Sequence, residues 1–248
     1  MIPYLHLGPL PLPTFGMMVA LALITSAYIL QWDFDRRKMK ADAFLMITFA
    51  GIAGIVGAKI YHLVDSPADR WMVFSRYGFA WFGGFLGGFG TMLVMGWQAK
   101  LPTLEFLDAC SPAASFGYAI GRIGCFLSGD GDYGKPTSLP WGMSFPNGVV
   151  PTTERVHPTP LYEFFIWCAI GALLWYLGGK WIRGRNIAGR IFCLYLILTG
   201  VARYLVEIIR INPPWILGLS NAQVASLASA IAGVILLLVL KSNKAQRA

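Results

Sequence analysis

Residues 13–32 read PTFGMMVALALITSAYILQW, a run of 20 residues without a charged side chain. A transmembrane helix needs about 20 apolar residues, because each residue rises about 1.5 Å through a hydrocarbon core roughly 30 Å thick. This run therefore predicts a membrane-spanning helix. It lacks the basic segment and cleavage site of a signal peptide, so we expect the helix to remain in the mature protein.

The composition of the whole chain agrees with this prediction. Of its 248 residues 56% are hydrophobic and 13% are charged, and the mean hydropathy is +0.58. Soluble proteins are roughly 45–50% apolar and about 25% charged, so a soluble fold could not cover this much apolar surface. We expect no soluble domain, and instead a single integral membrane domain over residues 1–248.

Further apolar runs of similar length follow along the chain. The seven helices that we expect cover residues 13–32, 43–65, 79–97, 103–127, 159–179, 190–210 and 221–240. The predicted fold class is therefore an all-α polytopic membrane protein with seven transmembrane helices.

Basic residues between these runs indicate the orientation. The segments after the first, third, fifth and seventh helices carry Arg36, Arg37, Lys38, Lys40, Lys100, Lys180, Arg183, Arg185, Lys241, Lys244 and Arg247, and the opposite segments carry Arg70, Arg76, Lys135 and Arg155. The positive-inside rule then places the N-terminus outside and the C-terminus in the cytoplasm. Because topology accounts for the net charge of +8, we do not expect nucleic-acid binding.

The stretch between the fourth and fifth expected helices, residues 129–158, is rich in Gly, Pro, Asp and Thr and too polar to span a membrane. The predicted topology makes it an outward-facing loop. Loops this long are usually functional or disordered, although an ordinary exposed connection is the alternative.

The four cysteines lie in or beside apolar runs without close pairs: Cys110, Cys125, Cys168 and Cys193. Their spacing suggests neither a zinc site nor a disulfide framework, and we expect no metal and no cofactor.

Several polar residues fall where lipid is expected, and a charge near the bilayer centre costs about 2.5–3.5 kcal/mol on insertion scales. They are Lys59, Arg122, Arg203 and Glu207, with Tyr162 and Glu163 at the outer start of the fifth helix. The second, fourth and sixth helices run from inside to outside, so all six residues reach the outward half of the membrane. The sequence therefore predicts one buried polar site that faces outward.

Each of these residues also has a structural explanation. Lys59 could extend its ammonium group to the headgroups. Arg203 and Glu207 are four residues apart and could form a structural ion pair, whereas Arg122 has no partner nearby in the sequence. Because a guanidinium binds phosphate through two parallel hydrogen bonds, Arg122 and Arg203 suggest a phospholipid headgroup as ligand.

The third expected helix contains small-residue repeats at Gly83, Gly84, Gly87, Gly88 and Gly90. Such repeats are typical of closely packed transmembrane helices. The alternative is that Gly83 and Gly84 let the backbone approach a bound ligand, because glycine lacks the side chain that would block it.

Four segments carry a likeness to a known family. Residues 121–130 read GRIGCFLSGD and precede Tyr133 and Gly134, residues 157–163 read HPTPLYE, residues 81–87 read WFGGFLG, and Arg203, Glu207 and Arg210 follow in the sixth helix. In this order they resemble the motifs of the prolipoprotein diacylglyceryl transferase family, over nearly the whole chain. The family's seven spans and outside N-terminus also fit.

The resemblance implies an enzyme of lipoprotein biosynthesis in the bacterial inner membrane, with its active site towards the outer face. It would transfer the diacylglyceryl group of phosphatidylglycerol to the thiol of the lipobox cysteine in a prolipoprotein signal peptide, releasing glycerol phosphate. The alternative is a divergent relative that binds phospholipid or modifies a different acceptor.

The resemblance also implies roles for individual residues. Arg122 and Arg203 match the family's phosphate-binding arginines, and Glu207 would hold Arg203. An acceptor thiol with a reference pKa near 8.5 needs a base or a positive field. The candidate bases are Asp130, Glu163, His157 and Glu207, and the expected substrate-binding residues are Arg122, Arg203, Tyr162, Gly83, Gly84, Cys125 and Lys59.

The chain departs from the family pattern at several positions. The family usually has His where this chain has Phe82, Asn where it has Cys125, and Tyr where it has Thr199 and Phe15. The loop around Asp130 is also one residue longer. Because that histidine is a proposed proton acceptor, the resemblance leaves the base unassigned.

Overall fold

A computed structural model describes residues 1–8, 10–66, 80–183 and 188–245. Within these residues the chain forms seven long helices and four short strands and divides into two compact units. Unit 1 comprises Met1–Ser26 and Leu107–Ala248, and unit 2 comprises Ala27–Phe106. Helix α1 (Thr14–Arg37) contributes to both. Four arginines used for the topology prediction lie outside the described residues: Arg70, Arg76, Arg185 and Arg247.

All seven expected helices are present. The five that are long and apolar enough to cross a membrane are α1, α2 (Ala43–Asp65), α5 (Thr159–Arg183), α6 (Arg190–Ile208) and α7 (Asn221–Ala245). The other two are α3 (Trp81–Gln98), which is rich in glycine, and α4 (Thr103–Ser128), which contains Glu105, Asp108 and Arg122. These residues lower the mean hydropathy. A helical, multi-pass membrane fold is therefore supported, while the crossing of all seven helices stays a prediction.

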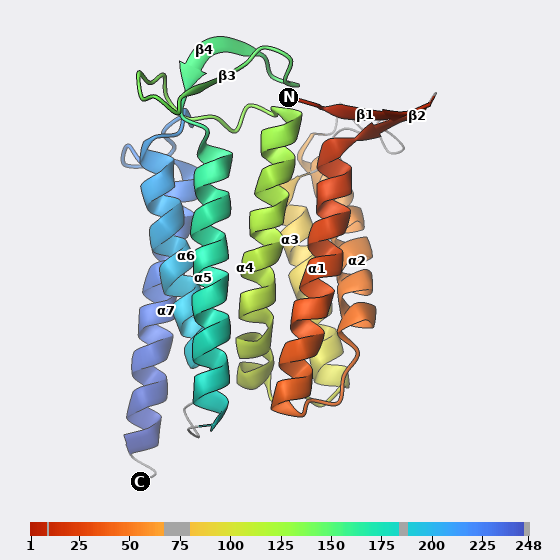
Figure 1. The fold of residues 1–248 in the computed structure, drawn as a ribbon. Helices are drawn as coiled ribbons and strands as arrows, with labels where there is room; N and C mark the ends of the chain where they lie inside the picture. Colours follow the sequence, from red (N-terminus) through yellow and green to blue (C-terminus); the bar gives the residue numbers. More distant parts are fainter. Residues whose placement is uncertain (9, 67–79, 184–187, 246–248) are drawn as a thin grey trace. The chain divides into compact units, whose positions relative to one another are not determined.

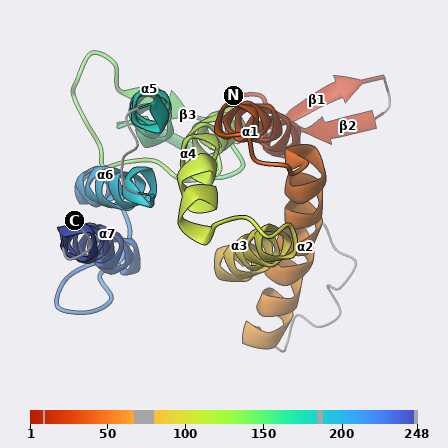
Figure 2. The same cartoon turned by 90° about the horizontal axis from the view of Figure 1, so that it is seen from below.

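In unit 2, helices α2 and α3 lie side by side (Figure 2). The side chain of Asp42 caps α2 by accepting a hydrogen bond from the backbone N–H of Leu45 at 3.0 Å. A Cβ atom on Gly83 would lie 2.2 Å from the carbonyl oxygen of Gly57, so the two backbones meet where neither residue has a side chain. Close packing therefore explains Gly83.

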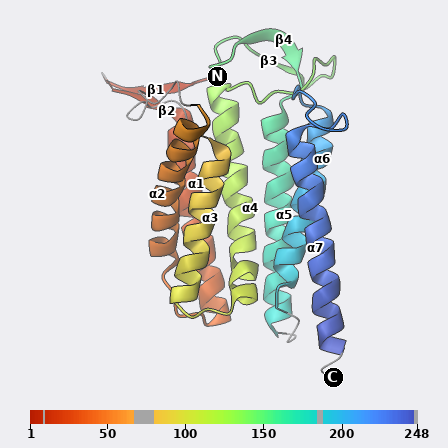
Figure 3. The ribbon, with the colours of Figure 1, turned by 180° about the vertical axis from the view of Figure 1, so that it is seen from behind.

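In unit 1, helices α4, α5 and α6 enclose an apolar core. Its buried members are Ala119, Trp167, Ile170, Leu174, Ile191 and Ala202. Tyr118 stacks on Trp167 with ring centroids 4.6 Å apart, so the hydroxyl-bearing ring is fixed from the core side. Helices α6 and α7 run side by side (Figure 3), with Gly200 against the backbone of Ser226.

The N-terminus of α6 is capped by a residue of another helix. Asp108 of α4 accepts hydrogen bonds from the backbone N–H groups of Gly189 and Phe192, each at 2.8 Å. The helix's own N-cap, Gly189, has no side chain to do this. Asp108 therefore fixes the start of the helix that carries Arg203 and Glu207.

The expected loop at residues 129–158 contains a hairpin of β3 (Met143–Phe145) and β4 (Thr152–Val156). Its apolar core consists of Tyr133, Phe145 and Val156. Figure 1 shows the hairpin beyond the end of α4 and the start of α5. A second hairpin joins β1 (Tyr4–Leu7) and β2 (Leu10–Pro13). The all-α prediction missed both hairpins, whose strands are only three to five residues long.

Candidate active site

Six charged side chains of unit 1 form one group of ion pairs, which we call the arginine–carboxylate cluster. Its members are Arg122 on α4, Asp132 in the following loop, Glu163 on α5, Arg203 and Glu207 on α6, and Arg210 just after α6. Three arginines thus face three carboxylates, so their formal charges balance. The cluster brings together four of the six polar residues that the sequence predicted to gather: Arg122, Glu163, Arg203 and Glu207.

Glu163 lies at the centre of the cluster and its side chain is fully buried. One carboxylate oxygen, Oε1, accepts hydrogen bonds from the Tyr118 hydroxyl at 2.8 Å and from Arg203 at 3.1 Å. The other oxygen, Oε2, lies 3.1 Å from Nε of Arg122 and 3.4 Å from Nη1 of Arg210. Glu163 therefore holds all three arginines together.

Glu207 is the second buried carboxylate. Its Oε2 lies 2.7 Å from Nη2 of Arg203 and 3.7 Å from Nε of Arg210. Its Oε1 accepts hydrogen bonds from Asn212 and, at 2.8 Å, from the hydroxyl of Ser220. The expected contact between Glu207 and Arg203 is therefore present, and the same carboxylate also binds both ends of the α6–α7 connection.

Asp132 bridges two arginines, because one oxygen pairs with Arg122 and the other with Arg210. Backbone pairing between Gly134 and Arg210 brings this loop against the end of α6. A Cβ atom at Gly134 would lie 2.7 Å from the Cβ atom of His157, so only glycine fits this approach. The loop's backbone, rather than sequence proximity, therefore places Asp132 in the cluster.

Two members of the cluster, Asp132 and Arg210, lie outside the helices, and their pKa values are shifted so that the charged form is favoured. Burial alone would raise the pKa of Asp132, but Arg210 and Arg122 outweigh burial and lower it. Burial alone would lower the pKa of Arg210, but Asp132 and Glu163 outweigh burial and raise it. Both side chains therefore stay charged at neutral pH.

The arginines differ in how fully they are engaged. Arg122, which has no partner nearby in the sequence, uses Nε on Glu163, Nη1 on Asp132 and Nη2 on the Tyr118 hydroxyl. Arg203 contacts carboxylates through Nη1 and Nη2. Within the described residues, its Nε forms neither an ion pair nor a hydrogen bond. Its side chain is 19% exposed, against 6% for Arg210. Arg203 is therefore the guanidinium best able to accept an added ligand.

Asp130 and Cys125 lie beside the cluster. The Cys125 sulfur and one oxygen each of Asp130 and Asp132 lie within 4.8 Å of one another, and Arg122 Nη1 lies 3.7 Å from that sulfur. Asp130 accepts a hydrogen bond from the backbone N–H of Asp132 at 3.2 Å, which is the contact expected of a turn residue. Burial raises the pKa of Asp130, and the neighbouring Asp132 charge adds to this. Two aspartates two residues apart therefore have pKa values shifted in opposite directions.

Two further expected site residues contact each other. Nδ1 of His157 lies 3.2 Å from the Tyr162 hydroxyl, which also accepts a hydrogen bond from Trp141 Nε1 at 2.8 Å. Both His157 and Tyr162 are half-buried. This triplet joins the loop at residues 129–158 to the start of α5, and within the described residues it forms no ion pair with the cluster.

The remaining expected residues belong to unit 2. Lys59 is half-buried on α2. Gly83 is packed against Gly57, whereas a Cβ atom on Gly84 would make only ordinary contact, 3.5 Å from that of Ala58. Packing therefore constrains Gly83 but not Gly84.

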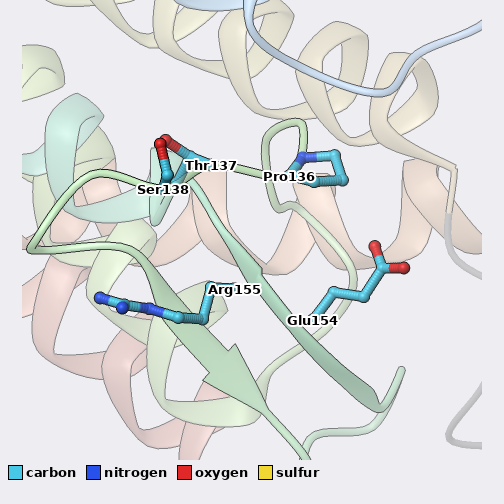
Figure 4. Close-up of a pocket in the computed structure, with 5 residues that line it drawn as sticks. All are labelled: Pro136, Thr137, Ser138, Glu154 and Arg155. Atoms are coloured by element: carbon cyan, nitrogen blue, oxygen red, sulfur yellow. The ribbon is translucent and has the colours of Figure 1, made fainter.

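A separate open hollow of about 500 Å³ lies on the loop at residues 129–158 (Figure 4). Pro136, Thr137 and Ser138 line it together with Glu154 and Arg155 of β4. The guanidinium of Arg155 donates to the backbone carbonyls of Leu139, Pro140 and Gly142, so its role is to hold the loop. None of the cluster residues lines this hollow.

Sequence reasoning did not select three residues that belong to the cluster or contact it: Tyr118, Asp132 and Arg210. Tyr118 precedes Arg122 by four residues and so lies on the same helix face. Arg210 follows Glu207 by three residues. Helical spacing could therefore have indicated both Tyr118 and Arg210. Asp132 could not be separated from Asp130 by spacing, because both lie in one glycine-containing turn.

Comparison with known proteins gives a consistent result. A family model described as prolipoprotein diacylglyceryl transferase matches residues 3–239. A phosphatidylglycerol–prolipoprotein diacylglyceryl transferase of Clostridium tetani is 32% identical over 231 residues, which cover 89% of this chain and 90% of the relative. Proteins of the same name from Leptospira interrogans and Bifidobacterium longum subsp. infantis are 30% and 31% identical. These matches cover 85% and 95% of this chain, and 77% and 82% of the relatives.

Proposed function

The chain belongs to the prolipoprotein diacylglyceryl transferase family, and we propose that it transfers the diacylglyceryl group of phosphatidylglycerol to the thiol of a prolipoprotein's lipobox cysteine. The lipobox would be presented by a signal peptide, and glycerol phosphate would be released. The observation that carries this proposal is the buried cluster of three arginines and three carboxylates between apolar helices. The guanidinium groups of this cluster offer hydrogen-bond donors to a phosphate, and the apolar helices around them also suit acyl chains.

The proposed reaction is a substitution at the glyceryl carbon that carries the phosphate. The thiol sulfur forms a bond to this carbon while the bond between the carbon and the phosphate oxygen breaks. The leaving glycerol phosphate takes the bonding electron pair, and the thiol proton passes to a base. Negative charge therefore grows on the leaving group, and guanidinium groups already in place stabilise it without reorganisation.

We assign the first phosphate contact to Arg203. Its side chain is partly exposed, and its Nε has no partner among the contacts of the described residues. Arg122 supplies a second positive charge held in a fixed position by Glu163 and Asp132. Glu163 and Glu207 would act as positioning residues, because they orient the guanidinium groups rather than touch the reacting atoms.

We assign the proton acceptor to Asp130. A general base works best when its pKa approaches the operating pH, and burial shifts the pKa of Asp130 in that direction. The neighbouring Asp132 has a lowered pKa and is committed to two arginines. Paired groups with oppositely shifted pKa values commonly divide acid–base and electrostatic roles between them. Glu163 and Glu207 are poorer candidates, because donors already surround each carboxylate.

We further propose that all seven helices span the bacterial inner membrane, with the N-terminus outside, the C-terminus in the cytoplasm and the cluster towards the outer face. The charges within unit 1 support this orientation. Glu163 lies near the start of α5 and Lys180 near its end, and Lys241 lies near the end of α7. The basic ends would then face the cytoplasm, as the positive-inside rule requires.

The test is a transfer assay with the full-length chain in phosphatidylglycerol vesicles and a synthetic lipobox peptide. We expect the peptide to gain the mass of one diacylglyceryl group and an equal amount of glycerol phosphate to appear. A peptide with serine in place of the lipobox cysteine, and vesicles of phosphatidylethanolamine alone, are the matched controls. Binding of phosphatidylglycerol without any product would instead support a lipid-binding relative. Restoration of lipid-modified prolipoprotein in a host depleted of its own transferase provides the test in cells.

A further inference from the structure

The connection between α6 and α7 ends in an exposed apolar projection, residues 211–219, which we call the apolar finger. Its sequence, INPPWILGL, contains no charged residue. The exposed fractions of its large side chains are 62% for Ile211, 65% for Trp215, 49% for Ile216 and 93% for Leu217. A soluble protein rarely exposes so many neighbouring large apolar side chains without a partner for them.

The tip of the finger is a tight turn that carries an unusual residue. Ile216 and Leu219 pair through their backbones, and Trp215 N–H also donates to the Leu219 carbonyl at 2.7 Å. The two central residues have positive φ values, 52° at Leu217 and 75° at Gly218, as in a type I′ turn. Asparagine or aspartate usually takes the first of these positions, because the left-handed conformation is unfavourable for a side chain such as leucine. The most exposed apolar side chain therefore occupies a place where local conformation disfavours it.

The base of the finger is fixed at both ends. Asn212 and Ser220 donate hydrogen bonds to the same oxygen of buried Glu207. Ser220 also forms a capping box with Gln223 at the start of α7, with N···O distances of 2.9 and 3.2 Å. The finger is therefore a projection from a fixed base, and the exposure of its tip follows from the fold.

We propose that the apolar finger inserts into the surrounding lipid bilayer and anchors this end of α6 and α7 among the acyl chains. Both helices are long and apolar enough to span a membrane, and the finger joins one directly to the other. It therefore lies at the membrane boundary, where apolar side chains gain by entering lipid. Trp215 has the amphipathic ring that prefers the headgroup level, and Leu217, at the tip of the turn, is the most exposed of these side chains.

The first experiment identifies what the tip contacts. A photoreactive benzophenone residue is placed at position 217 of the full chain, in vesicles of phosphatidylglycerol and phosphatidylethanolamine. The matched control carries it at exposed Ser138 of the outer loop. After irradiation, mass spectrometry should find phospholipid adducts at position 217 and at least about tenfold fewer at position 138, because a side chain exposed to water away from lipid has few acyl chains within reach. Equal labelling at both positions, absence of lipid adducts at 217, or adducts to a second copy of the chain would overturn the proposal.

The second experiment separates lipid insertion from the stability of the turn. The benzophenone residue is placed at position 215 in two chains, one with the native Leu217 and one with Leu217→Asn. The amounts of phospholipid adduct in the two chains are then compared. Asparagine suits the positive φ better than leucine, so the turn and the fold should be preserved. Lipid adducts should nevertheless fall at least about threefold, because the variant removes the apolar side chain that enters the bilayer. Unchanged labelling in a normally folded Leu217→Asn chain would contradict insertion. Neither experiment requires transferase activity.

Discussion

The α2–α3 pair of unit 2 and the arginine–carboxylate cluster of unit 1 hold helices together in opposite ways. At Gly57 and Gly83 two backbones approach so closely that a single added carbon would collide. Around Glu163, long charged side chains from α4, α5 and α6 and from the segment just after α6 meet through ion pairs. Within lipid, the hydrophobic effect does not drive helices to associate with one another. Close packing and polar contacts between helices must hold them together instead. One region should therefore be sensitive to volume and the other to charge.

Glu163→Gln should have the largest effect, because it removes charge at the centre of the cluster and keeps the volume. Two carboxylates would then face three arginines. Losing one partner of a buried pair costs about 3–5 kcal/mol. We expect thermal unfolding in detergent at a clearly lower temperature, together with transfer below about a hundredth of the native rate.

Tyr118→Phe is the matched control, since it removes the hydrogen bonds of the Tyr118 hydroxyl to Glu163 and Arg122 without changing any charge. Each lost hydrogen bond should cost about 1 kcal/mol, which is less than the loss of the central charge. If both variants unfolded at the same temperature, charge balance would not be what stabilises the cluster.

Gly83→Ala should have the next largest effect, because the added Cβ atom would lie 2.2 Å from the Gly57 carbonyl oxygen and the helices would have to move apart. Overpacking of this kind costs about 1–3 kcal/mol. Gly84→Ala, one residue along, meets only ordinary contact and should change stability by less than about 0.5 kcal/mol. Thermal unfolding of the two variants checks this. Loss of transfer in Gly84→Ala at native stability would show that this glycine serves a ligand rather than packing.

Arg203→Lys tests whether the cluster needs the shape of a guanidinium in addition to its charge. Lysine keeps the positive charge but cannot contact Glu163, Glu207 and a phosphate with one planar group. We expect transfer to fall at least about 30-fold, roughly 2 kcal/mol of transition-state stabilisation. Arg122→Lys should lower stability as well, because all three nitrogens of Arg122 have partners. Near-native transfer by Arg203→Lys would exclude it as the main phosphate contact.

Asp130→Asn should have the smallest effect on stability, because asparagine can keep the turn hydrogen bond to the backbone of Asp132. Transfer should fall about tenfold, roughly 1.4 kcal/mol, with an unchanged amount of protein in the membrane.

The pH dependence gives this prediction a second readout. A base must be unprotonated, so the native rate should rise as pH rises through the raised pKa of Asp130 and fall below it. Asp130→Asn should lose this acidic limb. Activity within a factor of about two of native, with the limb intact, would leave Asp130 as a turn residue and move the search for the base elsewhere.

The sequence by itself determined the helices and four of the six members of the arginine–carboxylate cluster. Long apolar runs allow little other structure in lipid, so all seven helices were predicted close to their observed bounds. Charges inside such runs are costly, which identified Arg122, Arg203 and Glu207 as residues needing buried partners. Glu163 was identified at the edge of its helix for the same reason.

Only the tertiary structure decided which of these charges pair. Asp132 and Arg210 are 78 residues apart, and the backbone bridge at Gly134 brings them together. Local spacing contains no information about such a bridge, so it could not separate Asp132 from Asp130. The choice between packing and ligand contact at Gly83 likewise depended on the position of Gly57's carbonyl oxygen on another helix. Helix formation depends on residues within a few turns, whereas ion pairing and steric fit depend on where distant backbones meet.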